Sequence, residues 1–220
     1  MTATQGRETG QQWERGNALL PDITPERIRS VLRSTPPDIG ESESQIRRAA
    51  VIVPVILRRD PVLLFTRRTE HLSSHAGQIC FPGGSYHASD GTLIQTALRE
   101  LAEEIGLKPE SVEIAGFLDA YETLNTGFRI LPVVGLVQEG FELIIDPHEV
   151  AETFEAPLSY LLDPRNHAIK QAERGGVVRE FYAITWEKHV IWGATAAMIV
   201  NLSERLRGTS PFAHRATGDT

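Results

Sequence analysis

Two segments of the chain have apolar residues at helical spacing. In residues 92–105 the apolar side chains recur every three or four positions, which places them on one side of a helix. They are Ile94, Leu98, Leu101 and Ile105. Residues 194–207 show the same spacing, so the pattern predicts one helix in the middle of the chain and one near its end.

A shorter helix is predicted from Thr24 to about Arg33. Thr24 is a good N-cap residue, Pro25 suits the first helical position, and Glu26 is an acid in the first turn. Two prolines at 36 and 37 end this helix, and residues 40–44 have the composition of a linker. We therefore expect an N-terminal arm over residues 1–40, a domain over residues 41–210 and a flexible tail over residues 211–220.

Runs that are rich in Val and Ile predict strands. Residues 49–57 and 62–66 are typical of two buried strands, joined by a turn at Asp60-Pro61. Further strands are predicted at 112–122, 128–137 and 141–145. A hairpin is predicted with arms at 167–173 and 179–185 and with Gly175-Gly176 at its tip.

Two stretches predict no regular element. Residues 70–84 contain too many polar and glycine positions, and from His148 onward helix-like and loop-like signals are mixed, with a break at Pro157. The order of strands, one helix, more strands and a closing helix predicts an α/β fold, with a mixed β-sheet between helices.

Composition narrows the class of protein. The 220 residues include 22 Lys and Arg against 29 Asp and Glu, and the net charge of −7 argues against broad binding to nucleic acid or to a membrane surface. No apolar run approaches the roughly 18 residues of a membrane span, and the N-terminus lacks the hydrophobic core of a signal peptide. Cys80 is the single cysteine, which excludes an intramolecular disulfide. We expect a cytoplasmic protein.

The central helix carries three acids on one side. At about 100° per residue, Glu104 lies about 40° from Glu100, and Glu103 lies about 60° from it in the other direction. Like charges at this spacing cost a helix about 0.2–0.5 kcal/mol per pair, so a cation should compensate them. Arg99 can pair with one acid, and a hard divalent cation such as Mg²⁺ suits the others. The alternative is an acidic face that is simply solvated.

The motif around these acids resembles the Nudix box. Its pattern is G-x5-E-x7-R-E-U-x-E-E-x-G-U, where U is aliphatic, and residues 84–107 follow its second half throughout. The matching residues are Arg99, Glu100, Leu101, Glu103, Glu104, Gly106 and Leu107. The first half departs, because Asp90 stands at the position of the first glutamate and eight residues separate it from Arg99. Either the loop is one residue longer or Gly91 holds that place.

A second resemblance is to the coenzyme A pyrophosphatase branch of the Nudix hydrolases. It is carried by residues 63–72 and 75–84, which read LLFTRRTEHL and HAGQICFPGG, and by residues 149–151 and 191–196. Two positions depart from the branch. Ser73 stands where an arginine is usual, which removes a contact to a phosphate, and His87 stands where an acid is frequent.

This resemblance implies an α/β/α sandwich and a metal-dependent reaction. Such enzymes cleave the diphosphate of coenzyme A or its thioesters by attack of water on phosphorus, giving 3',5'-ADP and 4'-phosphopantetheine or its acyl derivative. Mg²⁺ or Mn²⁺ would neutralise the phosphoryl charge. The partner is then a small nucleotide, and whether residues 1–40 pack on the domain, cover the site or mediate pairing into a homodimer stays open.

The same resemblance assigns roles to individual residues. Glu100 and Glu104 are the main metal ligands, and Glu103 is a further one. Arg99 orients the carboxylates, and the backbone carbonyl of Gly83 or Gly84 adds a ligand, because glycine permits close approach. The general base is left among three residues, which are Glu100, Glu149 and Glu152.

Other residues have competing interpretations. Arg67 and Arg68 either bind substrate phosphates or are surface charges at a strand end. His75 and Cys80, five residues apart, are compatible with an activated thiol, but the apolar neighbours of Cys80 favour a buried one. Aromatic residues at 121 and 192 either stack on adenine or, as we expect, belong to the core.

Two rival functions remain. One is hydrolysis of another nucleoside diphosphate derivative, such as ADP-ribose or a dinucleotide. The other is a non-catalytic Nudix-like module that senses a nucleotide, although such modules commonly lose the acids of the box, and Glu100, Glu103 and Glu104 are all present here.

Overall fold

The computed structural model describes residues 23–40, 47–72, 75–123, 127–174 and 176–209. The helices are α1 (Pro25–Val31), α2 (Leu93–Ile105), α3 (Leu158–Leu161) and α4 (Ala194–Arg207), with short 3₁₀ turns η1 (Ala88–Asp90), η2 (Pro109–Ser111) and η3 (Pro164–Asn166). The first strands are β1 (Arg47–Leu57), β2 (Val62–Arg68), β3 (Ile79–Cys80), β4 (Gly83–Ser85), β5 (Val112–Phe117) and β6 (Tyr121–Glu122). The later strands are β7 (Phe128–Gln138), β8 (Val150–Pro157), β9 (Ala168–Arg174), β10 (Val177–Trp186) and β11 (His189–Trp192).

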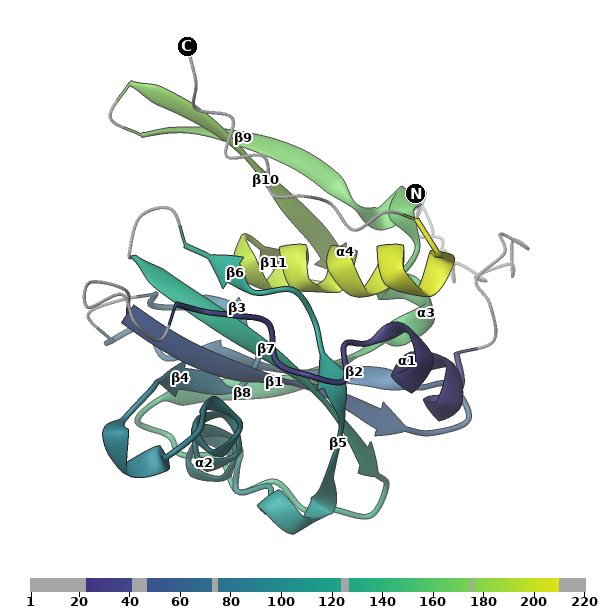
Figure 1. The fold of residues 1–220 in the computed structure, drawn as a ribbon. Coiled ribbons are helices and arrows are strands. Elements are labelled where there is room, and N and C mark those ends of the chain that lie inside the picture. The colour runs from purple at the N-terminus through teal and green to yellow at the C-terminus, as the bar shows by residue number, and fades with distance from the viewer. Residues whose placement is uncertain (1–22, 41–46, 73–74, 124–126, 175, 210–220) are drawn as a thin grey trace, which may run out of the picture.

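The main sheet is mixed, as the sequence predicts. Its strands run in the order β3-β2-β1-β7-β5, while β4 pairs with β1, β6 with β7 and β8 with β2. The long central pair β1 and β7 is parallel, and the other pairs are antiparallel. Strands β9, β10 and β11 form a second, antiparallel sheet. In Figure 1, α2 covers one face of the main sheet, and α4 lies on its other side with the second sheet.

The side chains of β1 face two separate hydrophobic cores, one on each side of the main sheet. Val53 and Val55 face a core that includes Ile28 of α1 and Leu202 of α4. Ala50, Ile52 and Ile56 face a second core, which contains Ala97, Leu101 and Ile105 of α2. Successive side chains of a strand point to opposite faces, so the central strands are buried on both sides. The predicted α/β/α sandwich is therefore confirmed.

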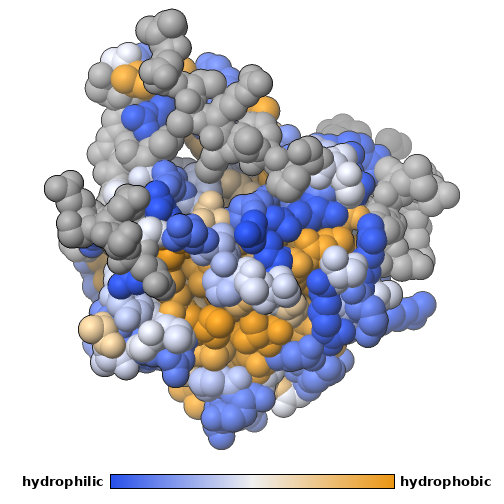
Figure 2. Space-filling model, viewed as in Figure 1, coloured by the Kyte–Doolittle hydropathy of each residue, from blue (hydrophilic) through white to orange (hydrophobic). Residues whose placement is uncertain are grey.

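Apolar side chains of this second core also reach the surface. Figure 2 shows them gathered in the lower part of the view, between the places where α2 and β5 lie in Figure 1, with polar side chains around them. Among the described residues, no helix is long and apolar enough to cross a membrane.

The two long predicted helices form where the sequence places them. Helix α2 begins after Thr92, whose hydroxyl accepts a hydrogen bond from the Gln95 backbone, and it ends at Gly106 in the left-handed conformation. Helix α4 occupies residues 194–207, as predicted. Helix α1 begins after its Thr24 cap but ends at Val31, before the predicted Arg33.

Four predictions about secondary structure are wrong. The single strand predicted at 112–122 is divided into β5 and β6, which pair separately with β7. Residues 141–145 form no strand, because the backbone amides of Ile144 and Asp146 instead bond the carbonyls of Ile105 and Glu104 at the end of α2. Residues 150–157, where the signals were mixed, form strand β8 against β2. Residues 70–84 include the short strands β3 and β4, whose partners are distant in the sequence. The hairpin forms as β9 and β10, while Gly175 of its predicted tip lies outside the described residues.

An ion pair fixes the loop that precedes α2. Asp90 accepts bonds from Arg99 at 2.8 and 3.1 Å, from the Thr96 hydroxyl at 2.8 Å and from the His87 backbone at 3.0 Å. Its side chain is only 4% exposed, and the hydrogen bonds from Arg99 hold the pKa of Asp90 well below its usual value. Asp90 therefore takes the place of the first glutamate of the motif, and the loop between it and Arg99 is one residue longer.

We expect Asp90→Ala to lower the free energy of unfolding by about 3 kcal/mol, because it removes the hydrogen bonds that a buried carboxylate accepts from Arg99, Thr96 and the His87 backbone. Urea denaturation at pH 7 measures this difference. The matched control is Asp60→Ala in the exposed turn between β1 and β2, for which a change within about 0.5 kcal/mol is expected. An equal loss in both variants would contradict the role of Asp90.

The loss should also depend on pH. Because the pKa of Asp90 is lower in the folded than in the unfolded state, its contribution is complete above the unfolded value of about 3.9 and declines as the pH falls below it. The difference between wild type and Asp90→Ala should therefore shrink below about pH 4. A difference that stays constant down to pH 2.5 would argue against the ionised pair.

Candidate active site

The candidate site begins where α2 crosses the glycine strand β4. A Cβ atom added to Gly84 would lie 2.3 Å from Oε1 of Glu100, so this carboxylate rests directly on the glycine backbone. A Cβ added to Gly83 would lie 2.4 Å from the Ala50 carbonyl oxygen in the neighbouring strand β1. The Gly83-Gly84 pair thus allows helix, strand and carboxylate to approach more closely than any larger residue would permit.

Glu104 is the most deeply placed acid of the site. Its side chain is 2% exposed, and its Oε2 atom has no hydrogen-bond partner. Burial raises the pKa of Glu104 to about 8, although Arg68, at 3.7 Å from Oε1, acts in the opposite direction. A buried carboxylate oxygen without a donor is an unsatisfied group, and a cation would satisfy it.

Arg99 connects the acids of α2. Its Nη1 atom lies 2.9 Å from Glu100 and 2.8 Å from Glu103, while its other nitrogen atoms hold Asp90. Burial raises the pKa of Glu100, and Arg99 counteracts this effect. Arg99 therefore holds the helix acids and the preceding loop in one arrangement.

The three acids do not converge equally. Glu103 is 59% exposed and lies on the outer side of Arg99, whereas Glu100 and Glu104 face the sheet. Within the described ranges, no three His, Cys, Asp or Glu side chains are gathered closely enough to hold a metal ion. Glu103 and Glu104 are adjacent, about 100° apart on the helix, and in this structure the Glu104 carboxylate points to the sheet while that of Glu103 points outward.

A fourth acid reaches this region from another element. Glu149 precedes β8, and its negative charge contributes to the raised pKa values of both Glu100 and Glu104. Its backbone carbonyl accepts a bond from the Thr69 amide, which fastens this turn to the end of β2. The structure thus brings Glu149, from 45 residues further along the chain than Glu104, to the acids of α2.

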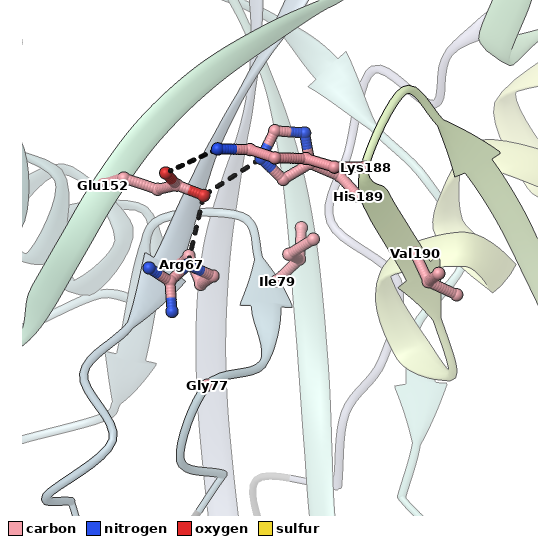
Figure 3. A pocket seen from close by; sticks show the side chains of 7 residues that line it. All are labelled: Arg67, Gly77, Ile79, Glu152, Lys188, His189 and Val190. Carbon is pink, nitrogen blue, oxygen red and sulfur yellow. Dashed lines mark hydrogen bonds and ion pairs between the residues drawn. The ribbon is translucent and has the colours of Figure 1, made fainter.

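The two adjacent arginines of β2 face different surroundings. Arg68 lies against Glu104, on the side of the sheet that α2 covers. Arg67 bonds Glu152 of β8 at 3.1 Å and lines a pocket of about 410 Å³ with Lys188 and His189 (Figure 3). Sequence reasoning named Arg67 and Glu152 but missed Lys188 and His189. No sequence motif marks these two residues, because the turn between β10 and β11 meets β2 and β8 only in the folded chain.

Several secondary candidates take no part in this arrangement. Cys80 contacts the Thr66 hydroxyl at 3.3 Å, and burial raises the pKa of its thiol to about 11, as expected for an unreactive thiol. His75 bonds Gln78 instead of Cys80. Tyr121 packs partly buried against the core, but Trp192 is 42% exposed, so the prediction of a core position is wrong for Trp192. Its ring leans edge-on against Phe181 at the surface of the second sheet.

The donor set fits a divalent cation. Glu100 and Glu104 supply carboxylate oxygens, Oε2 of Glu104 lacks any other partner, and the glycine backbone runs beside them. Oxygen ligands are those that hard divalent cations prefer.

Comparison with known proteins identifies the family of the chain. The family model of the NUDIX domain matches residues 46–174. A relative from Yersinia enterocolitica, named as the uncharacterised Nudix hydrolase NudL, is 38% identical over 170 residues, which cover 77% of this chain and 87% of the relative. The protein of the same name from Citrobacter koseri is 40% identical over 169 residues, which cover 76% and 86%.

Solved structures give a more distant likeness. A NUDIX hydrolase from Alicyclobacillus acidocaldarius aligns with a TM-score of 0.45 and 20% identity, over 55% of this chain and 83% of that one. The family match spans more than half of the chain, and the relatives are similar over most of their own length. The chain therefore belongs to the Nudix family of hydrolases.

Proposed function

We propose that this protein hydrolyses the diphosphate bond of coenzyme A or its thioesters, giving 3',5'-ADP and 4'-phosphopantetheine or its acyl derivative. Membership of the Nudix family supports hydrolysis of a nucleoside diphosphate derivative. The resemblance of residues 63–84, together with residues 149–151 and 191–196, supports the narrower choice of coenzyme A. The catalytic unit that we propose is the segment 41–210.

The observation that carries the proposal is the pairing of Glu100 and Glu104 beside Gly84. Nudix hydrolases generally depend on divalent metal ions, and these two carboxylates are the ligands that we assign, with Glu103 as a further one. We name Mg²⁺ or Mn²⁺ because both take oxygen ligands. When bound, such an ion neutralises charge on the diphosphate and lowers the pKa of a coordinated water.

The neighbouring residues prepare this arrangement. Arg99 holds Glu100 and Glu103 through ion pairs of 2.9 and 2.8 Å, so their carboxylates are oriented before substrate arrives. Gly84 leaves the space that Glu100 occupies. Arg68 supplies a positive charge next to Glu104, at the edge where a substrate phosphate would lie.

We assign the role of general base to Glu149. It lies exposed beside Glu100 and Glu104, where it can accept a proton from the attacking water. Glu152, the alternative from the same strand region, accepts bonds from Arg67 and His189 and pairs with Lys188. Its carboxylate thus lies on the other side of β2, away from Glu100 and Glu104.

The first test is a substrate panel with the purified full chain. In the presence of Mg²⁺ or Mn²⁺ we expect 3',5'-ADP to form from coenzyme A faster than AMP forms from ADP-ribose or from a dinucleotide, as followed by chromatography. Removal of divalent ions with EDTA should abolish turnover, and their return should restore it. The absence of 3',5'-ADP under every divalent ion would refute the choice of coenzyme A.

The second test concerns the acids. Glu100→Gln and Glu104→Gln keep the size of each side chain and remove its charge, so we expect kcat/KM to fall by about 100-fold or more. Glu149→Gln should lower kcat by about 100-fold and leave the affinity for Mn²⁺ unchanged, because a general base does not hold the metal. The control is Glu110→Gln in the exposed turn η2, which should keep wild-type activity. Near-normal turnover by Glu104→Gln would refute the metal assignment.

The third test concerns the glycine strand. Gly84→Ala pushes against the flexible Glu100 carboxylate, so we expect at least about a tenfold loss of kcat/KM with little loss of stability. Gly83→Ala instead meets the backbone of β1, and it should lower the midpoint of urea unfolding. Comparing activity and unfolding for both variants separates the two effects. Full activity of Gly84→Ala would show that the position of Glu100 is not critical.

A further inference from the structure

The pocket at Arg67 lies on the opposite side of the sheet from the acids of α2. Phe65 of β2 belongs to the core shared with α4, and Leu64 belongs to the core shared with α2. Alternation continues to the end of the strand, which sends Arg67 and Arg68 to opposite faces. The pocket and the acid site are therefore separated by one strand end, and consecutive Cα atoms there are about 3.8 Å apart.

One carboxylate organises the charged side of this pocket. Oε1 of Glu152 lies 3.1 Å from Nε of Arg67 and 3.0 Å from Nε2 of His189, and its Oε2 lies 3.5 Å from Nζ of Lys188. Figure 3 shows Arg67 of β2 pointing toward Glu152 from one direction, and the neighbouring residues Lys188 and His189, at the start of β11, from another. Because Arg67 uses Nε for this bond, its terminal nitrogen atoms point away from Glu152, and the exposed Glu70 approaches one of them at 3.4 Å.

The position of Glu152 is held rigidly. His189 stacks on Phe154 with a ring separation of 3.7 Å, and Phe154 stacks in turn on Phe65 at 5.1 Å. The imidazole is buried, so it cannot swing away from Glu152. By contrast, Lys188 is exposed, and its ion pair with Glu152 is long and easily exchanged for another anion.

The same two strands supply residues to both sites. Strand β2 carries Arg67 to the pocket and Arg68 to Glu104, while the β8 region carries Glu152 to the pocket and Glu149 to the acids. The pairing of β2 with β8 is irregular between Arg67 and Arg68, where Glu152 and Val150 are the successive partners. Bulges of this kind redirect side chains and recur beside active sites. A ligand that spans this strand end would contact both sites.

We propose that this pocket receives the phosphorylated ribose of the nucleotide substrate, with Arg67 and Lys188 contacting the phosphate monoester and Glu152 accepting a hydrogen bond from the adjacent ribose hydroxyl. This inference rests on the proposed function and specifies which part of the substrate is recognised. Guanidinium and ammonium groups are the usual partners of phosphate, and an ionised carboxylate can only accept hydrogen bonds. The two cationic side chains beside the fixed carboxylate thus match a phosphate beside a ribose hydroxyl. Ile79 and Val190, which also line the pocket, offer apolar contact to the sugar.

The test is direct binding of two nucleotides that differ only in the second phosphate. Isothermal titration with the full chain should give about tenfold tighter binding of 3',5'-ADP than of 5'-AMP, the scale of one charge-assisted contact. In Arg67→Gln, and further in the double variant Arg67→Gln/Lys188→Gln, this ratio should fall toward one. The control is Arg58→Gln, which removes a guanidinium paired with Glu155 of β8 away from the pocket and should keep the ratio. Urea unfolding verifies that each variant is folded.

A ratio near one in the wild type, or an unchanged ratio in Arg67→Gln, would overturn the inference. A second measurement needs no variant: wild-type kcat/KM should be about tenfold higher for coenzyme A than for dephospho-coenzyme A, and equal values would also overturn it. Failure of the proposed function is distinguishable. If coenzyme A is not hydrolysed but the binding ratio holds and depends on Arg67, the phosphate subsite stands and the proposed reaction falls.

Discussion

The close approach of α2 to the Gly83-Gly84 strand is the constraint on which the site depends. With the Glu100 carboxylate resting against Gly84, and with Gly83 pressed against the Ala50 carbonyl, helix, β4 and β1 are packed at backbone distance. This packing excludes water from Glu104, which is why its carboxyl is 2% exposed and has a raised pKa. A carboxylate that is costly to ionise alone becomes a strong ligand when a cation compensates its charge.

The fold stabilises this costly arrangement from outside the site. Arg99, which also holds Glu100 and Glu103, forms an ion pair with Asp90. The Thr96 hydroxyl and the His87 backbone amide donate the remaining hydrogen bonds to Asp90. The loop before α2 is thereby tied to the helix, although it differs in length from the usual motif. Asp90 thus meets a structural requirement, while the acids further along α2 remain available for chemistry.

Strands β2 and β8 contribute residues to both the acid site and the pocket on the opposite side of the sheet. Because neighbouring residues of a strand face opposite ways, Arg67 and Arg68 serve two different environments although they are adjacent in sequence. Glu152 of β8 and Glu149, which precedes this strand, likewise lie at different sites. The end of β2 thus separates the site of Glu100 and Glu104 from the pocket of Arg67 and Lys188, in which the weakly held Lys188 can pair with another anion.

The sequence by itself determined the elements whose signals are local. The cap at Thr92, the apolar spacing of α2 and α4 and the glycine after Ile105 define both long helices, because helices are stabilised by neighbours three and four residues away. The helical spacing also placed Arg99 next to Glu100 and Glu103. Only the tertiary structure decided that Glu104 is buried while Glu103 is exposed, that residues 150–157 form a strand, and that residues 141–145 close the end of α2 instead of forming one. Strand pairing, burial and the pocket of Lys188 and His189 depend on contacts between residues far apart in the chain, and no local pattern specifies which distant segment will be the partner.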